Sequence, residues 1–316
     1  MTSRYFLIFF FCFSAIASDC SPVNLITENN SPFRKIPVYN QGTINICYAY
    51  SAAQILDWYQ LKNGATKRNI HPAWAALQYA LKRNKAKLEI GHPKEAIESL
   101  RTSFNCDYEA VEAAVKTLGS SEEPETKILT SIERGQYRLP AGSTSVETLK
   151  LALEKNCPVE KRTLIMVPEV ERLNYETLHD DEAYETFFQS KFSTSPSPVS
   201  IAYCANVWKN SSFDGISTNT KGERDVVDKN CEYHESLVVG QKKVGNSCHY
   251  LVRNTWGNRW TATNKNYSCV CRDLATGEYA EDCRPETHGN DRYSVEGCWI
   301  KGKDLARNIG QLTYVK

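Results

Sequence analysis

Cys47 occupies a position in the sequence where a thiol could act as a nucleophile. From Tyr48 to Lys62, apolar residues recur at helical spacing, and Gly64 follows as a stop signal. Cys47 therefore lies at the N-terminus of a predicted helix, where unpaired backbone N–H groups and the helix dipole stabilise a thiolate. Most cysteines in a disulfide-rich chain are paired, so the residues around this one must decide its role.

His234 and Asn254 offer the partners that a thiol nucleophile needs. His234 opens the strand-like run 235–240, and Asn254 closes a second run, 250–253, so two adjacent antiparallel strands would bring the side chains together. The imidazole would exchange a proton with the thiol. The amide oxygen of Asn254 would accept a hydrogen bond from one ring nitrogen and fix the tautomer, and Trp256 would shield that bond from water.

Gln41 completes the set of candidate site residues. A turn from Gln41-Gly42 to Cys47 would return the amide beside the sulfur, where it and the backbone N–H of Cys47 would form an oxyanion hole. Each feature alone has an ordinary alternative: a plain turn at Gln41, a histidine without a role at the start of a strand, and an aromatic packing residue at Trp256. Their joint occurrence indicates nucleophilic catalysis.

These segments resemble the motifs of the papain-like cysteine peptidases. The matching segments, in the same chain order, are Gln41-Gly42, Cys47-Tyr48-Ala49-Tyr50-Ser51-Ala52, the strand that His234 opens, and Asn254-Thr255-Trp256-Gly257. The resemblance implies a two-lobed α+β fold, with an active cleft between a helical lobe that carries the cysteine and a β-barrel-like lobe that carries the histidine and the asparagine. It implies hydrolysis of a peptide or protein substrate through a thioester.

The resemblance also assigns a role to each residue. Cys47 would be the nucleophile, His234 the general base and acid, Asn254 the group that orients the imidazole, and Gln41 a donor of the oxyanion hole. No cofactor and no metal are expected.

The sequence departs from the family in three respects. Ile44-Asn45-Ile46 replaces the usual Cys-Gly-Ser/Ala before the nucleophile, so one family disulfide is lost and a side chain at Asn45 enters the approach of the substrate backbone. His234 lies farther from Cys47 than the ~130 to 150 residues usual for the family, which indicates an insertion within 126–184. The segment before Cys47 is too short for an inhibitory propeptide, so restraint by the insertion, an inhibitor or a regulatory partner is expected.

The elements that must position these residues divide the chain into two parts. Predicted helices span 72–85, 93–103, 108–117, 146–155 and 182–192, besides the one that follows Cys47, and predicted strands span 199–203, 235–240 and 249–253. The helical lobe is expected over residues 41–195. The β-rich lobe is expected over residues 196–316, with a cysteine-rich C-terminal extension. Residues 209–230 are predicted to form a long loop.

The N-terminus and the cysteines indicate the compartment. Residues 1–17 have the charge and the short apolar run of a signal peptide, so the peptidase-like domain is expected over 18–316, in a secreted or periplasmic protein. Removal of Cys12 from the 12 cysteines leaves an odd number, so one thiol is left over if the others pair. Cys47 is the predicted free thiol. Cys269-Val270-Cys271 could ligate a metal, but disulfides are favoured in this setting.

The overall composition excludes some partners and leaves some functions open. A chain of 316 residues with a net charge of +1 has no basic stripe for nucleic acid and no polybasic tail for a membrane, and a monomer is expected. Besides a peptidase, two hypotheses about the function remain. One is a catalytically silent binding protein on the same fold, and the other is an acyl transferase or cell-wall amidase that uses the same groups.

Overall fold

The computed structural model describes residues 20–41, 45–68, 70–88, 90–108, 146–218, 224–227, 229–257, 267–284 and 292–316. The predicted signal peptide, the predicted helix 108–117 beyond its first residue, and residues 126–145 of the predicted insertion lie outside these ranges. Within them, no helix has both the length and the apolar character needed to cross a membrane.

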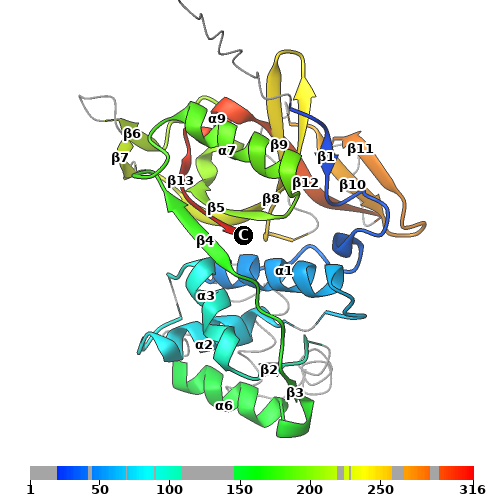
Figure 1. Ribbon diagram of the computed structural model, residues 1–316, viewed down its shortest axis with the longest axis vertical. Coiled ribbons are helices and arrows are strands. Elements are labelled where there is room, and N and C mark those ends of the chain that lie inside the picture. Colours follow the sequence, from blue (N-terminus) through cyan, green and yellow to red (C-terminus); the bar gives the residue numbers. More distant parts are fainter. Residues whose placement is uncertain are drawn as a thin grey trace, which may run out of the picture.

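One group of helices lies together on one side of the molecule (Figure 1). They are α1 (Cys47–Lys62), α2 (Pro72–Lys82), α3 (Pro93–Ser99) and α6 (Val146–Asn156). Proline is the first residue of both α2 and α3, where its fixed φ suits a helix and its missing N–H has no intrahelical acceptor. The predicted helices 72–85, 93–103 and 146–155 are thereby confirmed, with ends that differ by a few residues.

Helix α1 is buried on nearly all sides because it lies between α2 and α3 on one side and strands of the large sheet on the other (Figure 1). This position explains its sequence, in which alanines and aromatic residues surround the whole helix rather than one face. Because Cys47 is its first residue, the burial of α1 fixes the position of the thiol.

One antiparallel sheet of nine strands forms the other side of the molecule. Its strands are β1 (Val23–Asn24), β4 (Val170–Asn174), β5 (Val199–Cys204), β8 (Tyr233–Val244), β9 (Ser247–Arg253), β10 (Cys269–Asp273), β11 (Tyr279–Cys283), β12 (Tyr293–Lys301) and β13 (Ile309–Val315). The order is β11-β10-β12-β9-β8-β5-β13-β4, and β1 adds to β8. Helices α7 (Asp181–Thr194) and α9 (Gly302–Ala306) pack against each other and against strands of this sheet.

This strand order does not confirm the expectation of a barrel-like lobe. Among the described strands, β11 and β4 are the two ends of the order, and they do not pair with each other. The chain therefore has a mixed helix and sheet fold with an open sheet.

Two short strand pairs and the 3-10 helices complete the described structure. Strand β2 (Asn105–Cys106) pairs with β3 (Arg162–Thr163), and β6 (Ile216–Thr218) pairs with β7 (Arg224–Val227). The predicted loop 209–230 is therefore wrong in part, because two runs too short to show a strand pattern pair with each other. The 3-10 helices are η1 (Pro32–Arg34), η2 (Leu100–Thr102), η3 (Val159–Lys161) and η4 (Ala205–Trp208).

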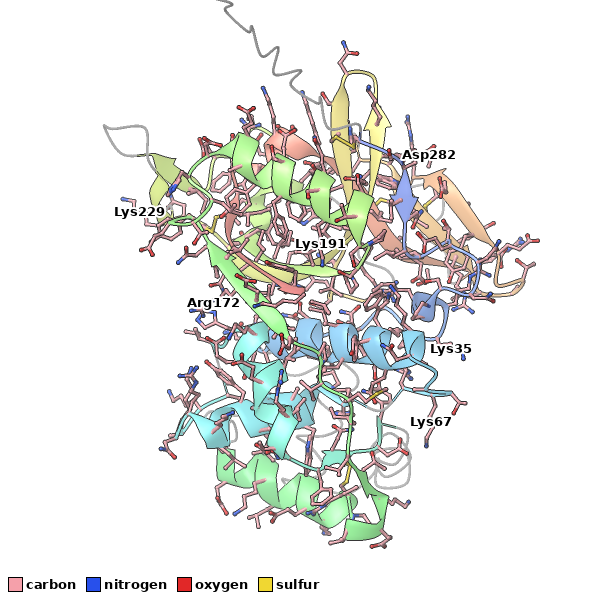
Figure 2. The ribbon with its side chains drawn as sticks, viewed as in Figure 1. Lys35, Lys67, Arg172, Lys191, Lys229 and Asp282 are labelled. Atoms are coloured by element: carbon pink, nitrogen blue, oxygen red, sulfur yellow. A yellow bond between two sulfur atoms is a disulfide. The ribbon has the colours of Figure 1, made fainter. Side chains whose placement is uncertain are left out.

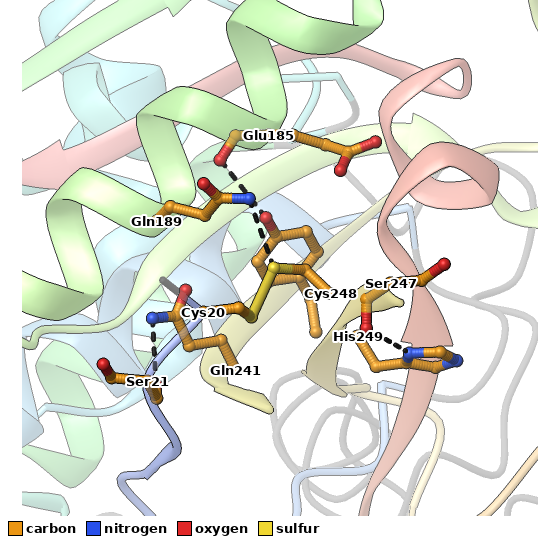
Figure 3. The surroundings of a disulfide bond; sticks show 9 residues. Cys20, Ser21, Glu185, Gln189, Gln241, Ser247, Cys248 and His249 are labelled. Carbon is orange, nitrogen blue, oxygen red and sulfur yellow. Dashed lines mark hydrogen bonds between the residues drawn. A yellow bond between two sulfur atoms is a disulfide. The ribbon is translucent and has the colours of Figure 1, made fainter. Parts of the chain in front are cut away.

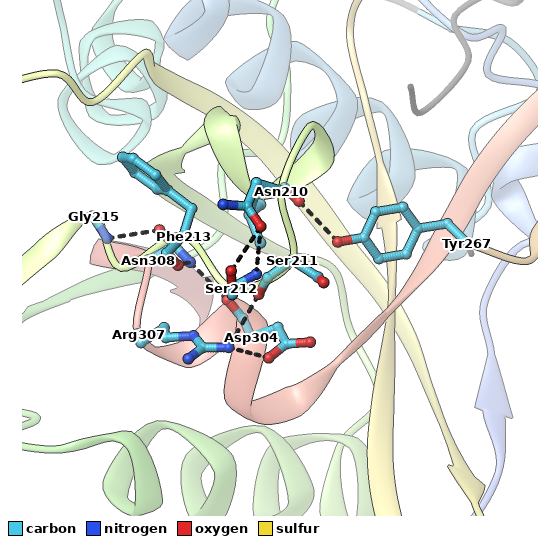
Figure 4. Close-up of polar contacts among 10 residues, drawn as sticks. Asn210, Ser211, Ser212, Phe213, Gly215, Tyr267, Asp304, Arg307 and Asn308 are labelled. Carbon is cyan, nitrogen blue, oxygen red and sulfur yellow. Dashed lines mark hydrogen bonds and ion pairs between the residues drawn. The ribbon is translucent and has the colours of Figure 1, made fainter. Parts of the chain in front are cut away.

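Asn308 fixes the loop that follows η4 (Figure 4). Its Nδ2 donates to the Phe213 carbonyl at 2.8 Å, and its Oδ1 accepts from Gly215 N at 2.9 Å. Arg307 donates to the Ser211 carbonyl at 3.0 Å. The loop between β5 and β6 is therefore held against the start of β13.

Disulfide bonds join all but one of the described cysteines. The pairs are Cys20–Cys248, Cys106–Cys157, Cys204–Cys231, Cys269–Cys298 and Cys271–Cys283. Cys47 is the free cysteine, which confirms the prediction from the odd count. The five bonds indicate an oxidising compartment, and Cys269 and Cys271 belong to disulfides rather than to a metal site. Figure 3 shows the Cys20–Cys248 bond, which ties the first described residue to β9.

Candidate active site

The start of α1 favours negative charge at the Cys47 thiol. The N-cap residue, Ile46, makes no side-chain cap, and its carbonyl accepts the first helical bonds, from Ala49 N at 2.9 Å and Tyr50 N at 3.3 Å. The N–H groups of Cys47 and Tyr48 precede these bonds, so no carbonyl within the helix accepts from them. The half-buried thiol lies beside these groups and at the positive end of the helix dipole.

Asn254 holds the imidazole of His234 in one orientation. His234 is the second residue of β8, Asn254 follows the last residue of β9, and the two strands pair antiparallel. His234 Nε2 and Asn254 Oδ1 are 2.8 Å apart. The Trp256 ring stacks on the imidazole, with ring centroids 4.3 Å apart. The structure therefore brings together the three side chains that the sequence predicts to meet.

A backbone donor identifies the tautomer of His234. Thr255 N donates to Asn254 Oδ1 at 2.6 Å, and a backbone N–H can act only as a donor. The atom that faces His234 is therefore the amide oxygen, and His234 Nε2 must carry the hydrogen. Neutral His234 then has its lone pair on Nδ1, which is the nitrogen left to accept a proton.

A chain of hydroxyl groups lies behind Asn254. Ser236 Oγ donates to Asn254 Oδ1 at 3.4 Å and lies 3.2 Å from the Tyr203 hydroxyl, which accepts from Trp208 Nε1 at 2.7 Å. All four side chains are buried. Ser236 and His234 lie two residues apart on β8 and so share one face of the strand. This network was not predicted from the sequence, although the strand period could have indicated Ser236.

Gln41 is joined to the turn that carries Asn254. Gln41 N donates to the Thr255 carbonyl at 2.8 Å, and Gln41 Oε1 accepts from Thr255 Oγ1 at 2.5 Å. Gly257 N donates to the Tyr39 carbonyl at 2.8 Å, and Gly257 adopts a φ of +91° that disfavours other residues. Because Oε1 faces Thr255, the NH₂ end of the Gln41 amide points away from that residue. Gly42, Thr43 and Ile44 lie outside the described residues, and Asn45 is exposed.

Burial opposes charge on both the thiol and the imidazole. It raises the pKa of Cys47 to about 12, and the charge of Glu235 acts in the same direction, whereas backbone hydrogen bonds from Glu235 and Tyr48 act against it. Burial lowers the pKa of His234 to about 4, against the hydrogen bond to Asn254. The resting site therefore holds a neutral thiol and a neutral imidazole.

Glu235 is a further residue near the nucleophile that was not predicted from the sequence. It follows His234 on β8, and its side chain is buried, with 3% of the residue exposed. Its charge and its backbone both act on the Cys47 thiol, which places α1 and β8 in contact at the nucleophile. A glutamate in an alternating strand gives no sequence signal of burial, because the pattern does not say which face is covered.

Comparisons with known proteins give structural likeness only. No model of a protein family matches the chain, and no curated protein matches its sequence. A chain from a study of the mite allergens Blo t 1 and Der p 1 aligns with a TM-score of 0.48 and 14% identity, over 90% of this chain and 67% of that one.

Two further solved structures align over most of the chain. Xylellain, a cysteine protease from Xylella fastidiosa, aligns with a TM-score of 0.43 and 16% identity, over 89% of this chain and 85% of its own. The bromelain protease from Ananas comosus, in complex with the E64 inhibitor, aligns with a TM-score of 0.42 and 13% identity, over 93% and 98%. Both are named as proteases.

Proposed function

We propose that the chain is a cysteine peptidase of the papain-like kind, with Cys47 as nucleophile, His234 as general base and acid, and Asn254 as the orienting residue. One observation supports this most: Asn254 binds His234 Nε2 and leaves Nδ1 as the basic nitrogen, and the free cysteine at the start of α1 contacts the backbone of Glu235, the residue after His234. Five disulfides accompany this one free thiol among the described cysteines.

Acylation begins with a proton transfer. The thiol proton of Cys47 passes to His234 Nδ1 as Sγ attacks the substrate carbonyl carbon. The carbonyl oxygen becomes an oxyanion, which the Cys47 backbone N–H and the Gln41 side-chain NH₂ would bind. The C–N bond then breaks, His234 returns the proton to the leaving amine, and a thioester remains. Water, deprotonated by His234, hydrolyses the thioester and restores the thiol.

Burial of the two reacting groups fits a proton transfer that occurs with substrate bound. A thiolate alone or an imidazolium alone is disfavoured, but the pair carries no net charge, and its opposite charges attract. The helix N-terminus adds to this attraction. Substrate that excludes water from the site strengthens each of these interactions.

Covalent labelling tests the nucleophile. A peptide with a thiol-directed electrophile should modify Cys47 in the folded protein, and Cys47→Ser should abolish labelling. Asn254→Ala should slow it by about tenfold or more, because the imidazole loses its fixed tautomer. Circular dichroism should confirm that each variant is folded. Absence of label on a folded wild-type sample contradicts the proposal and supports a catalytically silent binding protein.

Substrate profiling separates the peptidase from other reactions of the same groups. The wild-type protein should cleave bonds in a library of unmodified L-peptides and leave muropeptides intact. Cleavage of muropeptides alone would indicate a cell-wall amidase, and transfer to an added amine without hydrolysis would indicate an acyl transferase. We also propose that the protein is a secreted or periplasmic monomer. Its fold would have two lobes with the cleft at Cys47, and an inhibitor or a regulatory partner would control its activity.

A further inference from the structure

Glu235 has a buried carboxyl group that no described cation neutralises. Its Oε2 accepts one hydrogen bond, from Ser200 Oγ at 3.3 Å, and no described residue donates to Oε1. The described ion pairs include none to this residue. A buried carboxylate normally has a cationic partner or several donors, so this carboxyl lacks a partner that its charge would require.

The other charged groups on this side of β8 already have partners. Glu95 of α3 pairs with Arg172 of β4 at 2.8 Å and with Arg83 at 3.7 Å. Figure 2 labels Arg172 at the side of the molecule where β4 passes α3. Gln311 Nε2 lies 2.7 Å from His92 Nδ1. Glu95 also acts on Glu235 and, like burial, raises its pKa. The arginines therefore neutralise Glu95 and leave Glu235 uncompensated.

Glu235 lies directly beside the candidate nucleophile. It follows His234, its backbone hydrogen bonds to the Cys47 thiol, and the charge of its carboxyl acts on that thiol. Glu235 pairs with Ala202 of β5, so its side chain and that of Ala202 share the strand face opposite to His234. The small Ala202 leaves the carboxyl with a methyl group as its cross-strand neighbour.

We propose that Glu235 makes the enzyme selective for substrates with a lysine or arginine side chain close to the scissile bond. The inference rests on the proposed function and names its substrate class. A substrate ammonium or guanidinium group would supply the cation that the chain lacks, and an ion pair shielded from water is stronger than one on the surface. An isosteric neutral side chain would leave the carboxyl unpaired.

The protonation state of Glu235 couples this selectivity to pH. Burial raises the pKa of the carboxyl well above its usual range, against the hydrogen bond from Ser200. Binding of a cation stabilises the carboxylate, so the carboxyl releases a proton to solvent as the substrate enters. Preference for the cationic substrate should therefore increase as the pH rises.

Matched substrates test the proposal. Peptides that differ only by lysine or norleucine, scanned over the residues flanking the cleaved bond, keep the length of the side chain and remove its charge. At one position, kcat/KM of the wild type should favour lysine by about tenfold or more. Likewise, kcat/KM should be higher for a peptide with arginine than for the same peptide with citrulline. Equal values at every position, or a preference for norleucine, overturn the proposal.

Two variants assign the selectivity to Glu235. Glu235→Gln keeps the size of the side chain and the hydrogen bond with Ser200. The variant should cleave lysine and norleucine substrates with equal kcat/KM, because only the value for lysine substrates falls. Glu232→Gln is the matched control, because Glu232 immediately precedes β8. Its side chain is 53% exposed and pairs with Lys209 at 2.5 Å. This control variant should keep the wild-type ratio. A ratio that survives in Glu235→Gln contradicts the assignment.

Labelling rates separate this inference from the proposed function. Lysine and norleucine versions of one peptidyl electrophile report on recognition even if no peptide is hydrolysed. Equal labelling of Cys47 by both overturns the selectivity and leaves the nucleophile in place. Labelling by neither overturns the nucleophile and the selectivity together.

Discussion

At the scale of single residues, burial opposes charge on three titratable groups of the candidate site. It raises the pKa of Cys47 and Glu235 and lowers that of His234. Each group would be charged at some step of the proposed reaction or on substrate binding. The free energy for these charges must come from the substrate and from mutual attraction, so substrates that supply a complementary charge are favoured.

The stability of the Glu235→Gln variant should depend on pH. Below the unfolded-state pKa of about 4.3, the carboxyl is protonated in both states. Above it, the unfolded chain loses the proton and the folded chain keeps it, so the free energy of unfolding falls as the pH rises toward the folded-state pKa. Glutamine does not titrate, so the free energy of unfolding of the variant should equal that of the wild type at about pH 4 and exceed it at about pH 7.5.

Thermal denaturation at a series of pH values measures this difference. At this chain length, each kcal/mol corresponds to about 2 to 4 °C in Tm. Glu232→Gln should show no such trend, because its carboxyl is exposed and loses little on ionisation. A Tm difference that stays constant with pH would mean that the folded-state pKa of Glu235 is ordinary.

The residue types that carry chemistry were predictable from sequence, and their environment was not. The meeting of His234 and Asn254 followed from two strand-like runs, each with one of these residues at its end. The unpaired state of Cys47 followed from an odd count together with the Gln, His and Asn partners that only this cysteine has in the sequence. The burial of Glu235 did not follow, because alternation along a strand gives two faces and only tertiary packing decides which of them is covered.

At the scale of elements, Arg253 connects the parts that carry the candidate site. It is fully buried at the end of β9, next to Asn254. Its guanidinium donates to Glu296 of β12 at 2.5 Å, to Gln54 of α1 at 3.1 Å and to the Ile36 carbonyl at 2.6 Å. One side chain thus joins the helix of the nucleophile to the strand of the orienting residue.

Removal of one member of this buried pair should be strongly destabilising. Arg253→Met leaves the Glu296 carboxylate buried and unpaired, with an expected loss of about 3 to 5 kcal/mol in the free energy of unfolding. Urea denaturation measures the loss. Arg253→Met combined with Glu296→Leu should recover most of it, because no buried charge is then left. A single variant as stable as the wild type would mean that water reaches Glu296.

Gly240 shows where a local pattern was misread. The predicted strand 235–240 ends at this glycine, but β8 continues to Val244. A Cβ at Gly240 would lie 2.5 Å from the Val23 carbonyl oxygen, because β1 pairs with β8 at this point. The glycine permits the close approach of a strand more than two hundred residues away in the sequence, a contact that no local signal encodes.

At the scale of the whole molecule, disulfides join segments that the sequence could not pair. Cys20–Cys248 spans 228 residues and Cys106–Cys157 spans 51, whereas Cys271–Cys283 spans 12. The existence of disulfides followed from the cysteine count and the predicted signal peptide. The partners did not, because the number of possible pairings grows steeply with the number of cysteines. The mixed helix and sheet composition was predictable, whereas closure into a barrel was not found among the described strands.

Thiol titration tests this pairing over the whole chain. A protein that starts at residue 18 should show one reactive thiol per molecule when denatured without reductant, and the labelled peptide should contain Cys47. Cys47→Ser should show none. Three or more thiols would mean that at least one of the five disulfides is absent.

The raised pKa of Cys47 has a consequence for the maturation of the protein. In an oxidising compartment, a free thiol in a chain with disulfides can attack them and exchange partners, and only the thiolate does so rapidly. A thiol whose pKa is near 12 is almost entirely protonated, so scrambling through Cys47 is slow once α1 is buried. The burial that delays formation of the nucleophile therefore also protects the native set of disulfides.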